Sequence, residues 1–262
     1  MTHTGIAHRI NAERLMVLGW GRAILLQLAH PLIAAAVAEH STVSACPHAA
    51  AARLCHTVRA MLSLTFGDQQ AHTRTIDTIR GIHRRVHGRL RQAVGPYPAG
   101  TRYSAEDADL VLWVHMTLIE SIVLVYDDLV APLDEAARDE YCGQARGVAL
   151  ALGARAQDVP HTWADLVTSL DSTRRSGAIV VGPDAKRVAG AVLAPSMASL
   201  VWPVAWINRT MTIGTLPEDI RTQYGFGWTQ RHARRFDRVR RVLRAAQRRT
   251  PHAITRWAVA RQ

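Results

Sequence analysis

The sequence predicts an all-α protein built as a single compact multi-helix domain. Apolar residues recur at steps of three and four along most of the chain, and alternating strand patterns are scarce. Hydrophobic residues make up 48% of the chain and charged residues only 20%, which favours a sizeable core over disorder. Because no internal repeat or long linker divides the chain, we expect one helical domain over residues 1–230 and a basic amphipathic helical tail over 231–262.

The first half of the chain predicts four helical segments. The stretch Arg22–Glu39 is read as two helices that meet at His30-Pro31, because proline disfavours helix in the residue before it. Further helices are expected over Ala49–Leu64 and over Ala71–Val94. The run from Gly95 to Gly100, which contains two prolines, then carries the strongest loop signal in the chain.

The second half begins with a long helix, expected from about Ala105 to Asp127. Ser104 and Asp107 supply a hydroxyl and a carboxylate where the amides of its first turn need acceptors. The segments that follow share the helical period and are separated by short loops. They are Asp134–Leu152, His161–Leu170, Asp184–Ala194, Leu200–Thr210, Glu218–Tyr224 and Gln230–Gln247.

Two apolar stretches, Ala23–Ala38 and Ala189–Ile207, are candidates for membrane spans. Both fall short of the roughly 20 residues that a span needs, and prolines interrupt both, so we interpret them as buried core segments. The N-terminus lacks the arrangement of a signal peptide. Cys46, Cys55 and Cys142 show no C-x-x-C spacing and indicate reduced thiols rather than disulfides or a zinc finger. We therefore expect a cytoplasmic protein.

The basic charge is concentrated in the tail. From Arg231 onward the chain has 11 arginines and a single acid, whereas the rest is close to neutral, so no nucleic-acid partner is expected for the body. An apolar stripe on the tail indicates an amphipathic basic helix that docks on the body with its charged face in solvent. Binding to nucleic acid is the alternative, as is weak contact with a membrane surface. The stripe consists of Phe236, Val239, Leu243 and Ala246.

His115 lies in the middle of an apolar stripe on the long helix. Val111, Leu118 and Ile122 continue the stripe at steps of three or four, so the imidazole is expected to face the core, where its nitrogens need partners. A core histidine bonded to a neighbouring side chain is the simplest interpretation. Haem iron is the alternative, because a neutral imidazole binds iron through one nitrogen.

A second cluster of polar residues lies on the preceding expected helix. Arg80, His83 and His87 are spaced by three and four residues and should project from one face. An arginine beside a histidine could bind a haem propionate or stabilise developing negative charge on oxygen. Since Arg84 and Arg85 are close by, a solvated basic face is the alternative, and the pattern alone favours it.

Motifs of other helical enzymes are missing from the sequence. There is no E-x-x-H of a carboxylate-bridged di-iron bundle and no H-E-x-x-H of a zinc protease. There is also no G-x-S-x-G nucleophile elbow and no phosphate-binding loop. These enzyme classes are therefore disfavoured.

Several blocks of sequence, in this order, resemble the catalytic domain shared by bacterial latex-clearing proteins, which are rubber oxygenases, and the fungal oxygenase of mycophenolic acid biosynthesis. Each block is weak alone, but their joint order makes coincidence improbable, and together they extend over residues 14–230. The blocks are Arg22–Pro31 with Glu39-His40-Ser41, Phe66-Gly67, Ile82–Gly88, Tyr103–Asp107, Leu112–Ser121 with Tyr126, Pro132-Leu133, Tyr141, Leu216-Pro217, Arg221 and Tyr224-Gly225.

The resemblance implies a haem b bound inside the helical domain, with His115 as the proximal iron ligand. The family's distal R-x-x-K arrangement corresponds to Arg80-x-x-His83, so His83 would replace the lysine as a distal ligand or proton donor. Arg84 stands where the family has a threonine. The expected cofactor-binding set is therefore His115, His83, Arg80, Arg84 and His87, with His115 and His83 on the metal.

The resemblance further implies a haem-dependent oxidoreductase, an oxygenase that takes dioxygen, electrons from an unidentified reductant, and an apolar small molecule such as an isoprenoid or terpenoid. Asp68 is the nearest carboxylate to the family's catalytic glutamate, and structural roles are preferred for His30 and His40. Two alternatives stay open. One is a non-catalytic bis-histidine haem protein for sensing, storage or electron transfer, and the other is a degenerate helical interaction module.

Overall fold

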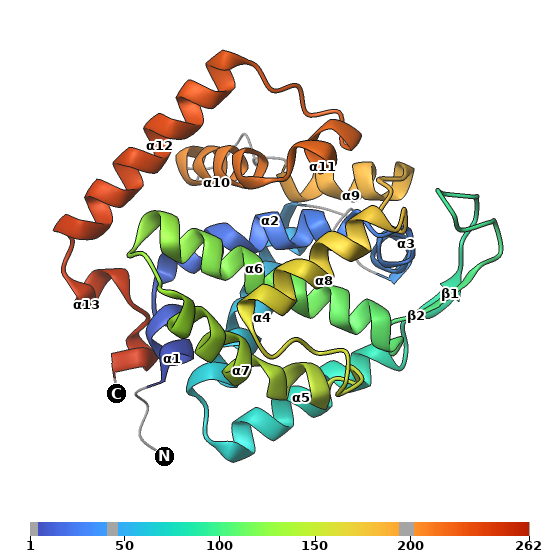
Figure 1. The fold of residues 1–262 in the computed structure, drawn as a ribbon, viewed down its shortest axis with the longest axis horizontal. Helices are drawn as coiled ribbons and strands as arrows, with labels where there is room; N and C mark the ends of the chain where they lie inside the picture. Colours follow the sequence, from blue (N-terminus) through green and yellow to red (C-terminus); the bar gives the residue numbers. More distant parts are fainter. Residues whose placement is uncertain (1–4, 41–46, 194–201, 262) are drawn as a thin grey trace.

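The fold is organised around one long central helix, α6 (Ala108–Leu129). The structure is a computed structural model that describes residues 5–40, 47–193 and 202–261. Over residues 47–55 it describes the backbone alone. Thirteen α-helices and one two-stranded hairpin make up this described part (Figure 1). The other helices are α1 Ile6–Asn11, α2 Val17–Leu28, α3 Pro31–His40, α4 Pro47–Phe66, α5 Gln69–His83, α7 Glu135–Ala151, α8 Trp163–Arg175, α9 Pro183–Leu193, α10 Trp202–Thr215, α11 Glu218–Gln223, α12 Gln230–Arg249 and α13 His252–Thr255. The hairpin pairs β1 (His87–Arg89) with β2 (Arg102–Ser104), and short 3₁₀ turns cover Arg14–Met16 and Ala258–Arg261. The predicted all-α class is confirmed.

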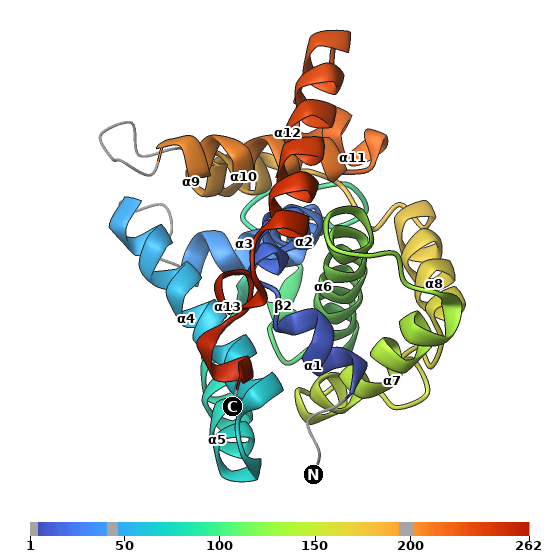
Figure 2. The same ribbon diagram turned by 90° about the vertical axis from the view of Figure 1, so that its left-hand side faces the viewer.

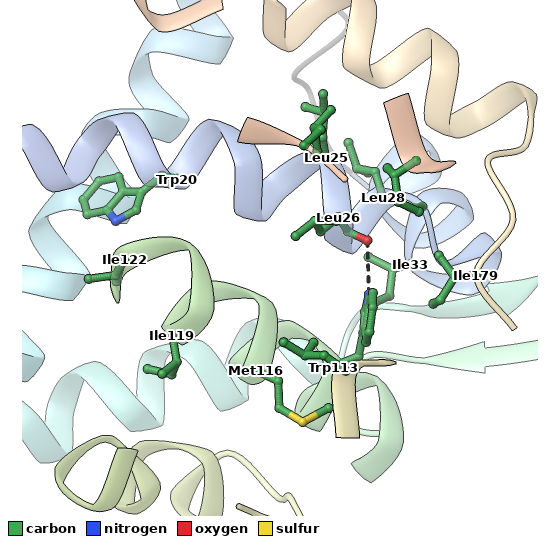
Figure 3. Close-up of a cluster of buried hydrophobic side chains, with 14 of the residues drawn as sticks. Trp20, Leu25, Leu26, Leu28, Ile33, Trp113, Met116, Ile119, Ile122 and Ile179 are labelled. Atoms are coloured by element: carbon green, nitrogen blue, oxygen red, sulfur yellow. Dashed lines mark hydrogen bonds between the residues drawn. The ribbon is translucent and has the colours of Figure 1, made fainter. Parts of the chain in front are cut away.

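The core forms where α2 packs along α6, with α7, α8 and α12 around them (Figures 1 and 2). Trp113 of α6 is 2% exposed, and its indole Nε1 donates to the Leu26 carbonyl of α2 at 3.1 Å (Figure 3). Arg22 of α2 is also buried and forms an ion pair with Glu120 of α6 at 2.5 Å. Its Nε donates to the carbonyl of Thr215 in α10, so one arginine joins three helices and has a partner for its charge.

The predicted break at His30-Pro31 is confirmed, because the helical segments before and after it meet at 107°. The downstream predictions of helices 134–152, 184–194, 218–224 and 230–247 are matched within a few residues by α7, α9, α11 and α12. Helix α8 continues five residues beyond the predicted Leu170, and α10 five beyond Thr210. Residues 194–201, which include part of the apolar stretch Ala189–Ile207, lie outside the described residues. Cys46 and the side chain of Cys55 also lie outside them, while Cys142 is a buried free thiol.

The prediction of one helix over Ala71–Val94 is wrong beyond His83. There α5 ends, and residues 87–89 pair with 102–104 in the antiparallel hairpin, whose tip contains the predicted loop 95–100. Gly88 lies opposite Tyr103, and a Cβ at Gly88 would collide with the tyrosine hydroxyl. The pairing joins strands more than ten residues apart, so the helical period of the local sequence could not indicate it.

The predicted cap of α6 is confirmed for Asp107 and wrong for Ser104. The carboxylate of Asp107, rather than the Ser104 hydroxyl, accepts a first-turn amide of the helix, that of Asp109 at 2.9 Å. Ser104 belongs to β2, and its Oγ accepts the Glu106 amide in the turn before the helix. The helix therefore begins three residues later than predicted.

The C-terminal residues dock on the body. Val239 of α12 is buried, and Phe236 and Leu243 pack against the core, so these three residues of the apolar stripe face inward as expected. Ala246, the fourth residue of the predicted stripe, is exposed. Beyond α12, the chain returns to the N-terminal segment, where Arg256 Nε donates to the fully buried Glu13 at 2.7 Å. Figures 1 and 2 both show the two termini at the same end of the molecule.

By length and composition α6 could cross a membrane, as could the bent pair formed by residues 14–28 and 31–40 taken as one span. Within α6, 56% of the most apolar window is buried inside the fold, and the helix lies in the middle of the bundle. These features are those of the core helix of a globular domain.

Candidate functional site

The central feature of the candidate site is the His115 imidazole, which projects from the third turn of α6. It retains partial solvent exposure, yet burial lowers the pKa of His115 to about 4. No hydrogen bond joins the imidazole to any described residue. It is therefore neutral at pH 7, with a nitrogen lone pair available to a ligand.

His83 is the second candidate ligand and the last residue of α5. Its Nδ1 is buried and has no hydrogen-bond partner among the described residues. Burial lowers the pKa of His83, and the nearby Glu106 carboxylate opposes this shift. An unpaired buried ring nitrogen is costly unless a ligand or a water completes it. No hydrogen bond or ring contact links His83 to His115 in the described structure.

The three other predicted cofactor-binding residues are exposed. Arg80 lies one turn before His83 on α5, and Arg84 is the C-cap of that helix. The expectation that His87 shares this helical face is wrong, because α5 ends at His83 and His87 lies in β1. The structure thus keeps Arg80, His83 and Arg84 together and moves His87 to the hairpin. There the backbone carbonyl of His87 lies 3.1 Å from His40 Nε2.

The structure offers the ring nitrogens of His115 and His83 as donors for the haem iron that the resemblance implies. The described residues contain no group of three histidine, cysteine or carboxylate side chains able to hold a metal ion. A haem iron needs only one or two protein ligands, and histidines with unpaired nitrogens are its usual partners. The residues present therefore fit the group that the resemblance implies. None of the three hollows described in the chain is lined by His115 or His83, so a buried haem pocket stays a prediction.

His30 and His40 are bound into local structure, in agreement with the roles expected for them. His30 caps α3, since its Nδ1 accepts the Leu32 amide at 3.3 Å, and its Nε2 lies 3.2 Å from the Tyr97 hydroxyl. His40 Nε2 lies 3.3 Å from the hydroxyl of Tyr103. Both tyrosines come from the hairpin, so these pairings followed from no local sequence pattern.

Two other carboxylates, those of Asp68 and Glu39, are engaged in local structure. Asp68 caps α5 by accepting the Ala71 amide at 2.7 Å, which is a structural task for a residue considered as a catalytic carboxylate. Glu39 accepts a 2.5 Å hydrogen bond from the Tyr103 hydroxyl, and this bond, with help from Arg91, lowers the pKa of Glu39. No local sequence pattern predicts the Glu39–Tyr103 pair, although both residues stand in blocks of the family resemblance.

Comparisons with known proteins identify the family of the chain. A family model described as "ER-bound oxygenase mpaB/B'/Rubber oxygenase, catalytic domain" matches residues 8–245, a range that contains both α5 and α6. The uncharacterized proteins Mb2261 of Mycobacterium bovis and Rv2237 of Mycobacterium tuberculosis each share 27% identity over 237 residues. The match covers 87% of this chain and 88% of each relative. No solved structure matches the chain significantly.

Proposed function

The chain belongs to the family formed by the catalytic domains of the ER-bound oxygenase mpaB/B' and rubber oxygenase, and from this premise we propose that it is a haem b-dependent oxygenase whose iron is bound by His115. The family supports an oxygenase function in general. The cofactor, the ligand residues and the apolar substrate are the proposed parts. The observation that carries the proposal is the partnerless, desolvated imidazole on the central helix.

His115 is suited to bind iron because it needs no deprotonation at neutral pH. A metal-binding imidazole must be neutral, and with a pKa of about 4 nearly all His115 side chains are neutral at pH 7. The helix that carries it is anchored on several sides by buried side chains, among them Trp113 and Ile122. A rigid helix holds a ligand more accurately than a loop does.

His83 and Arg80 would be the residues that contact the reacting oxygen or the cofactor together with His115. The unpaired Nδ1 of His83 offers either a second iron ligand or a proton for the reacting oxygen. Arg80 and Arg84, both exposed cations next to His83, would bind the propionate groups or balance negative charge. His87 is an exposed hairpin residue, and of the five predicted cofactor-binding residues it has the least support.

The chemistry that haem b supplies when bound is the activation of dioxygen. The protein's own residues favour an apolar substrate. Leu112 and Leu118, three residues to either side of His115, are partly accessible, and Ile82 beside His83 is 48% exposed. A surface formed by these three apolar side chains would bind an isoprenoid or terpenoid chain and exclude water from the reacting atoms. Electrons would come from an external reductant.

A non-catalytic bis-histidine haem protein is the second candidate function, and the unpaired Nδ1 of His83 favours it. The two candidates differ once the iron is reduced. If both histidines stay bound to the iron after reduction with dithionite, the absorption spectrum remains that of six-coordinate, low-spin haem. That result would support the non-catalytic function. The oxygenase requires an open position, so a His83→Ala variant should keep haem and become high-spin and five-coordinate.

Labelled oxygen tests the oxygenase proposal directly. The haem-loaded protein, reduced with dithionite and mixed with squalene as an isoprenoid probe under ¹⁸O₂, should form products that carry ¹⁸O. A His161→Ala variant removes an exposed histidine outside the candidate site and should retain this activity. Absence of label from every product of squalene and of shorter terpenoid olefins would contradict the proposal.

A further inference from the structure

One hollow of the described structure, which His115 does not line, lies between α10, α12 and the loop that follows α11. These elements lie side by side in both ribbon views (Figures 1 and 2). The hollow has a volume of about 510 Å³, which is within the range typical of small-molecule sites. We call it the α10–α12 groove. It is lined by Trp206, Arg209, Thr210, Ile213, the loop residues 225–228, His232 and Arg235.

One wall of the α10–α12 groove is a tryptophan held in place by its neighbours. The guanidinium of Arg221 lies 4.4 Å from the centre of the Trp228 ring, and the His232 imidazole stacks on this ring at 5.8 Å. The Phe236 ring packs against the Trp228 ring in a T-shaped arrangement, with 6.2 Å between the two ring centres. A wall fixed before binding lowers the entropy cost of ordering it around a ligand.

The other wall carries positive charge. Arg235 lies over the Trp206 ring at 5.6 Å, and Arg209 projects from α10 one turn later. Neither arginine forms an ion pair with a carboxylate of the described residues. On the same helix, by contrast, Arg240 and Arg244 both pair with Asp128. The groove therefore presents guanidinium donors that have no carboxylate partner among the residues that the structure describes.

His232 adds a hydrogen-bond donor. Its Nδ1 accepts the backbone amide of Thr229 at 3.2 Å, as part of the capping box at the start of α12. Because Nδ1 is an acceptor there, the neutral imidazole carries its proton on Nε2. The residue thus contributes a flat apolar surface together with an N–H group.

We propose that the α10–α12 groove binds a small organic anion in which a carboxylate or phosphate is joined to an apolar or aromatic body. The tryptophans would stack on the body, and Arg209, Arg235 and His232 would bind the anionic group. The concave shape and aromatic walls favour a small molecule over a membrane surface or a nucleic acid. This proposal uses none of the residues assigned to haem, so either can fail without the other.

The experiment uses a pair of dyes that differ mainly in charge. Anilinonaphthalene sulfonate matches the proposed ligand, and N-phenylnaphthylamine has the same aromatic body without the anionic group. The sulfonate should bind with enhanced fluorescence and at least about tenfold more tightly than the neutral dye. Hexyl phosphate or hexanoate should displace it, and hexanol should not. The more effective of the two competitors identifies the anionic group.

Adjacent arginines on α12 supply matched variants. Arg235 lines the groove, whereas Arg234 is equally exposed on α12 and lies outside it. The Arg235→Ala change should weaken sulfonate binding about tenfold, because it removes a charge-assisted hydrogen bond, while Arg234→Ala should change it less than about twofold. Melting temperatures check that both variants are folded.

Four results would overturn the proposal. The first is equal affinity for the two dyes, and the second is an equal loss in Arg234→Ala and Arg235→Ala. The third is binding to phosphatidylglycerol vesicles without displaceable dye, which would indicate a basic membrane-binding face. Sulfonate binding should also survive the His115→Ala change. Its disappearance there would assign the dye to the candidate haem site and overturn the proposal as well.

Discussion

Mild acid should destabilise the protein through His30. This side chain is 6% exposed, and burial lowers the pKa of His30 to about 4 against an ordinary value of 6.5, an effect that Asp107 opposes. Since Nδ1 accepts the Leu32 amide, a second proton would also break the cap of α3. Between pH 6.5 and pH 4 the unfolded chain binds a proton that the folded protein does not. The free energy of unfolding therefore falls as the pH falls.

The structure gives the size of this effect. A pKa of about 4 in the folded state predicts that His30 alone costs about 2 kcal/mol between pH 7 and pH 5, and about 3 kcal/mol by pH 4. Urea unfolding across this range measures it. His30→Asn keeps a side-chain acceptor for the Leu32 amide but cannot titrate, so its stability should fall by about 2 kcal/mol less than that of the wild type.

A control variant distinguishes titration from lost packing. Tyr97→Phe removes the hydrogen bond to His30 at a cost of about 1 kcal/mol but leaves a buried imidazole, so its pH dependence should resemble that of the wild type. Equal losses between pH 7 and pH 5 in the wild type and His30→Asn would refute the reasoning.

Two further predictions concern packing. Glu13→Gln should lower the free energy of chemical unfolding by about 3 kcal/mol, because Arg256 loses a fully buried carboxylate as its partner. The C-terminal segment should also become accessible to protease. Wild-type stability in this variant would contradict the role given to the Glu13–Arg256 pair. Gly21→Ala should cost about 1–3 kcal/mol because its Cβ would collide with the Thr212 hydroxyl of α10, whereas Gly143→Ala, in the open on α7, should add about 0.5–1 kcal/mol. Thermal melts that shift both alanine variants in the same direction would contradict this explanation.

The sequence predicted the helices well because their signals are local. Apolar periodicity and the proline after His30 were enough to place α3, α7 and the end of α2, although α2 begins at Val17, five residues before the predicted Arg22. The stripe on α12 predicted its docked face. The hairpin was missed because its two strands are defined by each other. Nothing between Arg84 and Leu90 except Gly88 interrupts a helical pattern.

Individual residues of the candidate site could be predicted from the sequence, but the contacts between them could not. The stripe containing His115 was visible because α6 has one period over 22 residues. The partners of His30 and His40 were not visible, because Tyr97 and Tyr103 reach them from the hairpin. The α10–α12 groove was missed for the same reason. It combines tryptophans and arginines from three elements that only the tertiary fold brings together.

The most direct test of the central proposal is the haem content of a His115→Ala variant. After reconstitution with haem and gel filtration, the ratio of Soret absorbance to protein absorbance should approach one haem per chain in the wild type and in the control His161→Ala. The ratio should fall greatly in His115→Ala, because the iron loses its proximal nitrogen. A His115→Ala protein that folds and retains the wild-type ratio would show that this imidazole does not hold the cofactor.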